Sequence, residues 1–164
     1  MPRRDIVERA VAKRLFARAA RRPVIVPPEL TDRIESLLAR RCCDTLGLAR
    51  RAGAAVAGFE RVSEAVRRGD AGLLLFARDS AEAGRRRLSA LGREVPTAAE
   101  LAADELSGAF GRERVAFVAV GPGPLCFRLR RDLERLAGFR TAAGGMDNAA
   151  AQPAQQNGGA SAHE

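Results

Sequence analysis

The sequence predicts an α/β fold, namely a three-layer α/β/α sandwich with a four-stranded mixed sheet. Short apolar runs alternate, over residues 46–120, with segments whose apolar residues recur at helical spacing. One run, Gly72 to Ala77 (GLLLFA), is apolar throughout, as in a strand that helices cover on both faces. Layers of this kind bury the apolar faces of sheet and helices together. The expected strands are residues 54–57, 72–77, 92–96 and 115–120.

Residues 1–29 are expected to form a basic helix and a proline-rich link. The helix covers residues 5–22 and shows a loose apolar stripe beside a face of cations. Pro23, Pro27 and Pro28 end it, because proline disfavours helix in the residue before it. A segment this short cannot have its own core, so it either docks on the main domain or frays. The sequence leaves two interpretations of this segment open, a solvated basic helix and an arm that contacts RNA.

The main domain, residues 30–139, is expected to begin with a helix between Pro28 and Gly53. Thr31 or Asp32 is the expected N-cap, because short polar side chains accept hydrogen bonds from the first helical N–H groups. The apolar residues of this helix at helical spacing are Leu30, Ile34, Leu37, Leu38, Cys42, Leu46 and Ala49.

A second helix is expected from Phe59 to about Arg68, with Gly58 as its cap. Glycine suits this place because it lacks the Cβ that restricts other residues. The free N–H groups and the partial positive charge of a helix start attract phosphate. The sequence therefore offers a phosphate seat directly after the first strand.

Capping patterns place the next two helices. Asp79 and Ser80 follow the second strand and are expected to cap a helix whose triple arginine, Arg85 to Arg87, suits a solvated face. Thr97 and Glu100 have the spacing of a capping box, which predicts a helix over residues 98–110. A last helix follows over residues 125–138, and residues 140–164, rich in Ala, Gly and Gln, are expected to be disordered.

The charge of the chain indicates a polyanionic partner. The 28 Lys and Arg exceed the 20 Asp and Glu, for a formal net charge of +8. Residues 1–29 carry 8 basic and 3 acidic residues, and residues 41–140 carry 18 and 13. All the basic residues except Lys13 are arginine, whose planar fork donates two parallel hydrogen bonds to phosphate. Nucleic acid is the expected partner.

The sequence lacks the residues that other functional classes require. No window of 18 apolar residues exists, so no membrane span is expected, and the N-terminus lacks a signal-peptide core. Cys42, Cys43 and Cys126 form no disulfide framework, which fits a cytoplasmic protein, and we expect no metal and no cofactor. The lone histidine is His163, and no nucleotide fingerprint is present, so the sequence does not predict an enzyme.

The phrases LGLARRAG, AGFERVSEAVRRG and LLLFARDSAEAGRRRL, in this order and spacing, resemble the L-seven-Ae family of ribosomal and kink-turn RNA-binding proteins, in particular its bacterial YlxQ-type members. The resemblance covers roughly residues 34–139. Residues 1–29 resemble the end of a YlxR domain without its Cys-containing start and glycine-rich middle. We therefore expect either a remnant of that domain or a natural start further upstream.

The resemblance implies a two-part RNA site. In the family, the start of the second helix grips RNA through an Asn, a Glu and, three residues on, a Lys or Arg. The matching positions are Glu60, Arg61 and Glu64. A carboxylate at position 64 repels phosphate and cannot donate to a guanine edge, so kink-turn specificity stays open.

The other half of the site in the family is the loop before the last strand. Here two arginines flank Glu113, which favours phosphate contacts over apolar packing on a base. The site residues implied are Gly58, Phe59, Glu60, Arg61, Glu64, Arg67, Arg68, Gly111, Arg112, Glu113 and Arg114.

The expected function is therefore non-catalytic binding of structured RNA, associated with the ribosome. One alternative is a DNA-binding, nucleoid-associated regulator, which the diffuse positive charge suits. The other is a protein-docking module of the translation or transcription machinery, in which Glu60, Glu64 and Glu113 meet a basic partner. The sequence identifies neither the RNA that is bound nor the oligomeric state.

Overall fold

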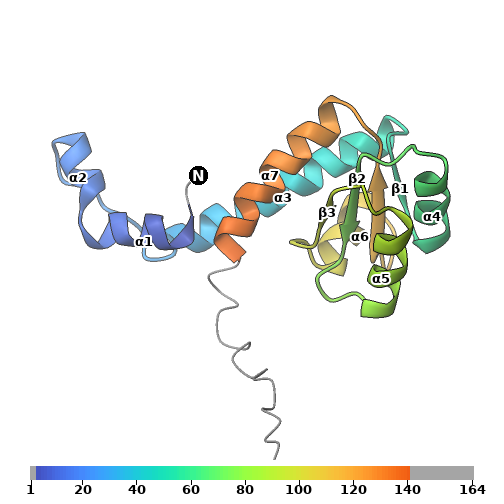
Figure 1. Ribbon diagram of the computed structural model, residues 1–164. Helices are drawn as coiled ribbons and strands as arrows, with labels where there is room; N and C mark the ends of the chain where they lie inside the picture. The colour runs from blue at the N-terminus through green and yellow to red at the C-terminus, as the bar shows by residue number, and fades with distance from the viewer. Residues whose placement is uncertain (1–2, 141–164) are drawn as a thin grey trace, which may run out of the picture.

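The computed structural model describes residues 3–140, which form a mixed α/β structure of seven helices and a four-stranded mixed sheet (Figure 1). The tail expected to be disordered lies outside the described residues, apart from Arg140, which ends the last helix. The helices are α1 (Arg4–Ala12), α2 (Leu15–Ala20), α3 (Leu30–Arg51), α4 (Phe59–Arg67), α5 (Glu82–Leu91), α6 (Ala103–Phe110) and α7 (Pro124–Arg140). The strands are β1 (Ala55–Ala57), β2 (Leu73–Phe76), β3 (Thr97–Ala98) and β4 (Phe117–Val120).

The sheet has the strand order β1-β4-β2-β3. β4 lies antiparallel to both β1 and β2, whereas β3 lies parallel to β2. The prediction of a four-stranded mixed sheet is therefore confirmed. This pairing brings the ends of β1, β2 and β3 and the start of β4 to the same end of the sheet.

The two faces of β2 belong to two different clusters of buried side chains. Leu73 and Leu75 pack with residues of α3, α6 and α7, whereas Leu74 and Phe76 pack with residues of α4 and α5. Successive side chains of a strand point to opposite faces, so a run that is apolar throughout can enter two clusters. All four residues of β2 are buried, which confirms the expected buried strand.

The third strand was expected over residues 92–96, and this prediction is wrong. Those residues form the turn after α5, and the strand is Thr97–Ala98. Proline has no N–H to donate to a neighbouring strand. Pro96 takes part only through its carbonyl, which accepts from the Leu74 N–H at 2.9 Å, and paired residues follow it.

The prediction that Thr97 and Glu100 form a capping box is also wrong, because Thr97 lies in β3. α6 begins at Ala103 instead of residue 98. The Glu105 carboxylate accepts from the Ala102 N–H at 2.8 Å, and Asp79 accepts from the Ala103 N–H at 2.8 Å. Asp79 thus caps α6, and the prediction that Asp79 and Ser80 cap the following helix is wrong: that helix begins after Ala81 without a side-chain cap.

The first helix was expected to be continuous over residues 5–22, but it is broken. α1 ends at Ala12, α2 begins at Leu15, and Arg14 between them adopts a left-handed conformation with φ 50°. Neither helix contains a buried residue. Because neither helix packs on the core, no contact with the core requires one straight helix. The break lets apolar side chains of both helices line one hollow.

α3 and α7 pack side by side (Figure 1). Glu29, and not Thr31 or Asp32, occupies the N-cap position of α3, and Thr31 is a buried residue of the first turn. Leu37, one of the apolar residues at helical spacing in this helix, is 64% exposed. α3 has 22 residues and is thus about 33 Å long, which exceeds the height of this sheet, so its N-terminal half reaches beyond the core.

Candidate functional site

The two halves of the site expected from sequence lie at one end of the sheet. β1 leads into α4, and the loop 111–114 leads toward β4. Ala57 of β1 pairs with Val118 of β4, and the Gly58 N–H donates to the Phe117 carbonyl at 2.9 Å. The start of α4 is therefore fixed to the strand that the loop precedes. We call residues 58–61 together with residues 111–114 the sheet-end face.

The start of α4 presents backbone donors without a side-chain cap. Gly58 is its N-cap residue, with φ 100°, a conformation that residues with a Cβ rarely adopt. Its Cβ position has no atom within 4 Å, so backbone geometry and not crowding selects glycine. Glu60 and Arg61 are exposed in the first turn. The helix start can receive an anion, with one carboxylate and one guanidinium beside it.

The loop 111–114 is exposed along its whole length. Gly111 (φ 59°) and Arg114 (φ 56°) are both left-handed, which is uncommon for arginine. The Arg112 N–H donates to the Ser107 carbonyl at 3.2 Å, and this bond ties the loop to α6. The loop and α6 line a hollow of about 560 Å³, to which Asp104 and Glu113 contribute carboxylates.

Phe59 does not offer a free aromatic face. Its ring packs edge-on against Phe117, with 5.8 Å between ring centroids. The guanidinium carbon of Arg87 lies 4.7 Å from the Phe59 centroid, a cation–π arrangement. Arg87, expected on a solvated face, therefore reaches the sheet-end face, which sequence reasoning missed. α5 follows the carboxyl end of β2, and that topology is the signal that could have found it.

The loop between β2 and α5 also lies at this end of the sheet and was missed. The Ala77 N–H donates to the Ala116 carbonyl at 2.8 Å. Arg85 donates to the Ser80 hydroxyl at 2.9 Å and to the Ala77 carbonyl at 3.0 Å, so it holds this loop in place. Arg78 is exposed on this loop, and its charge acts on Glu105 of α6.

Three of the expected site residues lie toward the other end of α4. Arg68 pairs with Glu64 at 3.5 Å and with Asp70 at 3.2 Å. Asp70 precedes β2, whose start lies at the opposite end of the sheet. The structure therefore separates Arg67 and Arg68 from the loop 111–114, and it engages Glu64 with Arg68.

The arginines of the sheet-end face differ in their partners from Arg41, which is held by a buried carboxylate. Arg61, Arg112 and Arg114 are exposed, and none of them forms an ion pair within residues 3–140. In contrast, the half-exposed Arg41 pairs at 2.8 Å with Asp132, which is 1% exposed. Cations without carboxylate partners are available to a polyanion, and they need not break an existing pair to bind it.

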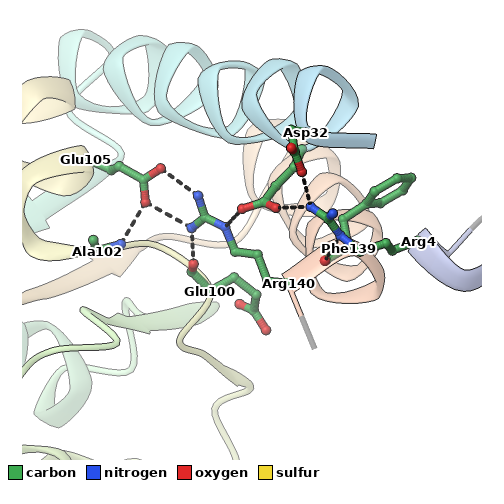
Figure 2. Close-up of polar contacts among 8 residues, drawn as sticks. Arg4, Asp32, Glu100, Ala102, Glu105, Phe139 and Arg140 are labelled. Carbon is green, nitrogen blue, oxygen red and sulfur yellow. Dashed lines mark hydrogen bonds and ion pairs between the residues drawn. The ribbon is translucent and has the colours of Figure 1, made fainter. Parts of the chain in front are cut away.

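A second polar cluster joins four helices (Figure 2). Arg140 donates to both carboxylate oxygens of Glu105, at 2.9 and 2.7 Å, and to Glu35 at 3.0 Å. Arg4 donates to Glu35 and to Asp32 at 2.8 Å each, and to the Phe139 carbonyl at 3.1 Å. Glu35 thus bridges the two arginines, and α1 is fixed to α3 and α7.

The charged groups of this cluster pair with one another and hold the helices together. Burial alone would raise the pKa of Glu105, but the hydrogen bonds from Arg140 and the Ala102 N–H, together with the positive charges of Arg140 and Arg78, outweigh it, and the pKa is lowered. Burial raises the pKa of Glu100, and its buried Oε2 has no hydrogen-bond partner. Glu105 carries its charge against Arg140, and the Thr31 hydroxyl accepts a hydrogen bond from Arg4 at 3.4 Å. The arrangement fixes α1 and α6 to α3 and α7.

The cysteines lie in the interior. Cys42 and Cys126 are buried, and burial raises the pKa of the Cys42 thiol to about 12. The half-buried Cys43 thiol contacts the Glu105 carbonyl at 3.5 Å, and burial raises its pKa to about 11. Within residues 3–140, no three metal-ligating side chains gather closely enough to hold an ion. None of the helices in that range combines the length and apolar composition that crossing a membrane requires.

Comparisons with known proteins support the fold alone. No family model matches the chain, and no curated protein matches it in sequence. The structure is similar to that of a protein with unknown function from Bacillus halodurans C, with a TM-score of 0.53 and 22% sequence identity. The match covers 57% of this chain and 96% of the other. At this identity the likeness concerns the arrangement of helices and strands.

Proposed function

We propose that this protein binds structured RNA without catalysing a reaction, as an L-seven-Ae-like, YlxQ-type protein of the cytoplasm associated with the ribosome. The observation that carries the proposal is the meeting of the α4 start and the loop 111–114 at one end of the sheet. The three arginines there without ion pairs suit phosphate, and the left-handed loop holds two of them beside a hollow. The two clusters that flank the sheet suit a three-layer sandwich.

The chemistry favours contacts to the RNA backbone over reading of bases. Phe59 is packed against Phe117 under Arg87, so no aromatic platform is free on this face. Backbone N–H groups and guanidinium groups position a nucleic acid and carry little sequence information. We therefore propose recognition of RNA shape, with one nucleotide seated in the hollow beside the loop 111–114.

The experiment replaces Arg61, Arg112 and Arg114 together with Ala. Affinity for a kink-turn RNA, an unkinked RNA duplex and a DNA duplex is measured by fluorescence anisotropy at several salt concentrations. RNA affinity should fall at least tenfold, and the log–log salt slope should become shallower by about 0.7 to 0.9 for each phosphate that the variant no longer neutralises. The matched control replaces Arg128, Arg130 and Arg131 of α7, three exposed arginines without ion pairs among the described residues.

Several outcomes would contradict the proposal. Equal losses of affinity in the two triple variants would mean that diffuse charge, and not this face, binds the RNA. Equal affinity of the unaltered chain for DNA and RNA would favour the nucleoid alternative. No salt dependence would favour protein docking.

The variant Glu64→Lys tests whether RNA bound at the sheet-end face also reaches along α4 to the position where Glu64 pairs with Arg68. The substitution removes a carboxylate and restores a cation where the resembled family has one. It should strengthen RNA binding and favour the kink-turn RNA over the unkinked duplex. Unchanged or weaker binding would contradict the expectation that a cation at position 64 contacts the RNA.

A further inference from the structure

The N-terminal arm, which we define as residues 3–26, lies outside the packed core. Figure 1 shows α1 and α2 at the end of the α3–α7 pair away from α4 and α5. Because neither helix contains a buried residue, the arm adds little to the apolar core. Its composition therefore needs an explanation other than folding of the main domain.

The arm carries a block of positive charge. No acidic residue occurs between Glu8 and Glu29. Within that interval only Arg9 forms an ion pair among the described residues, with Asp5 at 3.4 Å. A dense run of like charge repels itself and is typical of segments that bind nucleic acid. The unpaired cations are Lys13, Arg14, Arg18, Arg21 and Arg22.

The arm also contains an apolar hollow beside these cations. Its volume is about 340 Å³, and side chains of α1, α2 and the proline-containing link line it. Phe16, 39% exposed, lines the hollow together with Arg14 and Val24. Proteins that bind single-stranded nucleic acid combine a positive groove with an aromatic side chain against which a base stacks. The hollow brings both features together.

The root of the arm is held in place. Arg4 is bonded to Asp32, Glu35 and the Phe139 carbonyl, and its side chain is 15% exposed (Figure 2). Glu35 is held in turn by Arg140. The direction in which α1 leaves the core is therefore fixed before any partner arrives, which reduces the entropy cost of binding.

We propose that the N-terminal arm binds a single-stranded stretch of the same RNA that the sheet-end face binds. Phosphates lie on Lys13, Arg14 and Arg18, and one base enters the hollow against Phe16. The inference rests on the proposed function, since one RNA reaches both surfaces. The α3–α7 pair lies between them, so the RNA extends several nucleotides beyond its structured part. Joint binding makes the second contact intramolecular and raises affinity.

The test uses the full chain and two RNA probes, a hairpin and the same hairpin with ten uridines added at either end. The extension should raise the affinity of the unaltered chain at least tenfold at fixed salt. It should raise that of the variant Lys13→Gln, Arg14→Gln, Arg18→Gln less than threefold, while binding of the bare hairpin changes little. The matched control, Arg128→Gln, Arg130→Gln, Arg131→Gln, should keep the full gain.

A second comparison separates stacking from charge. Phe16→Ala should weaken binding of the uridine extension by about tenfold, and it should leave binding of an abasic extension of equal length unchanged. Phe127→Ala, which alters a 64% exposed phenylalanine of α7, should have no effect on either probe. Phe16→Leu keeps the apolar volume without the aromatic face, and circular dichroism checks that the helices persist.

The outcomes separate the two proposals. An equal gain from the extension in the arm variant, or no gain in the unaltered chain, overturns the inference. Binding of anionic phospholipid vesicles that depends on the arm, without such a gain, would make the arm a membrane contact. If the bare hairpin does not bind but ten uridines alone bind through the arm, the sheet-end function fails and the arm's binding stands.

Discussion

Replacing Arg140 with Met should cost far more stability than replacing an exposed arginine. Arg140 is 14% exposed and holds Glu105 and Glu35, which are 28% and 23% exposed. Removing one partner of a buried pair costs about 3–5 kcal/mol, whereas an exposed pair contributes about 0–1 kcal/mol. Because the carboxylates keep some contact with water, we expect a loss of about 3 kcal/mol, including the hydrogen bond to the Glu100 carbonyl.

The matched control is Arg86→Met. Arg86 pairs with Glu82 one helical turn away, and the two side chains are 78% and 71% exposed. Its removal should cost no more than about 0.5 kcal/mol. The free energy of unfolding is measured for both variants by urea denaturation at pH 7. For a domain of this size, about 3 kcal/mol corresponds to a fall of roughly 10 °C in the thermal midpoint.

The reasoning would be refuted by equal losses of stability in the two variants. Arg140→Lys supplies a further check, because lysine keeps the charge but cannot donate to both oxygens of Glu105 in parallel. Its stability should lie between that of the unaltered chain and that of Arg140→Met. If lysine fully restored stability, charge alone and not the geometry of the fork would hold the cluster.

Other predictions concern pH and glycine packing. The pKa of Glu105 is lowered, so the contribution of Glu105 to folding stability is complete above its unfolded pKa of about 4.3 and is lost as the pH falls through the folded pKa. Glu105→Gln should therefore reduce the loss of stability that denaturation curves show at acidic pH. The raised pKa of Glu100 means that its charged form lowers the stability of the folded chain, so Glu100→Gln should stabilise the fold at pH 7. Lower stability of this variant would contradict the prediction. Gly84→Ala should destabilise by about 1–3 kcal/mol because its Cβ would lie 2.5 Å from the Phe117 ring, whereas the control Gly108→Ala, with open space and helical backbone, should stabilise by about 0.5–1 kcal/mol.

Elements with a strong local pattern were predictable. The run Leu73–Phe76 is apolar without interruption, and it forms the buried strand β2. Gly58 before an amphipathic segment marked the start of α4 within one residue. In both cases the deciding interactions, side-chain burial and backbone conformation, are set by residues close together in the sequence.

The candidate site was predictable in part. Residues 58–61 and 111–114 lie at the same end of the sheet, and that they form one RNA site stays a prediction. The position of α5 after the carboxyl end of β2 indicated this end of the sheet, but the contact of Arg87 with the Phe59 ring depends on how α5 crosses that ring. Arg67 and Arg68 lie away from the loop because they end α4, and Arg68 is paired there with Asp70, which no local pattern reveals.

Local patterns in the chain predict the alternation of helices and strands, the buried central strand and the positive charge, since burial patterns and composition involve residues close together in sequence. The groups that satisfy the ends of the elements are instead selected by contacts between distant segments. Thr97 and Glu100 fit the spacing of a capping box, yet the hydrogen bond from Leu74 draws this segment into the sheet. Asp79 then caps a helix 24 residues away, and Arg140 closes a cluster of four helices. Such partners are chosen by proximity in space, which sequence spacing does not encode.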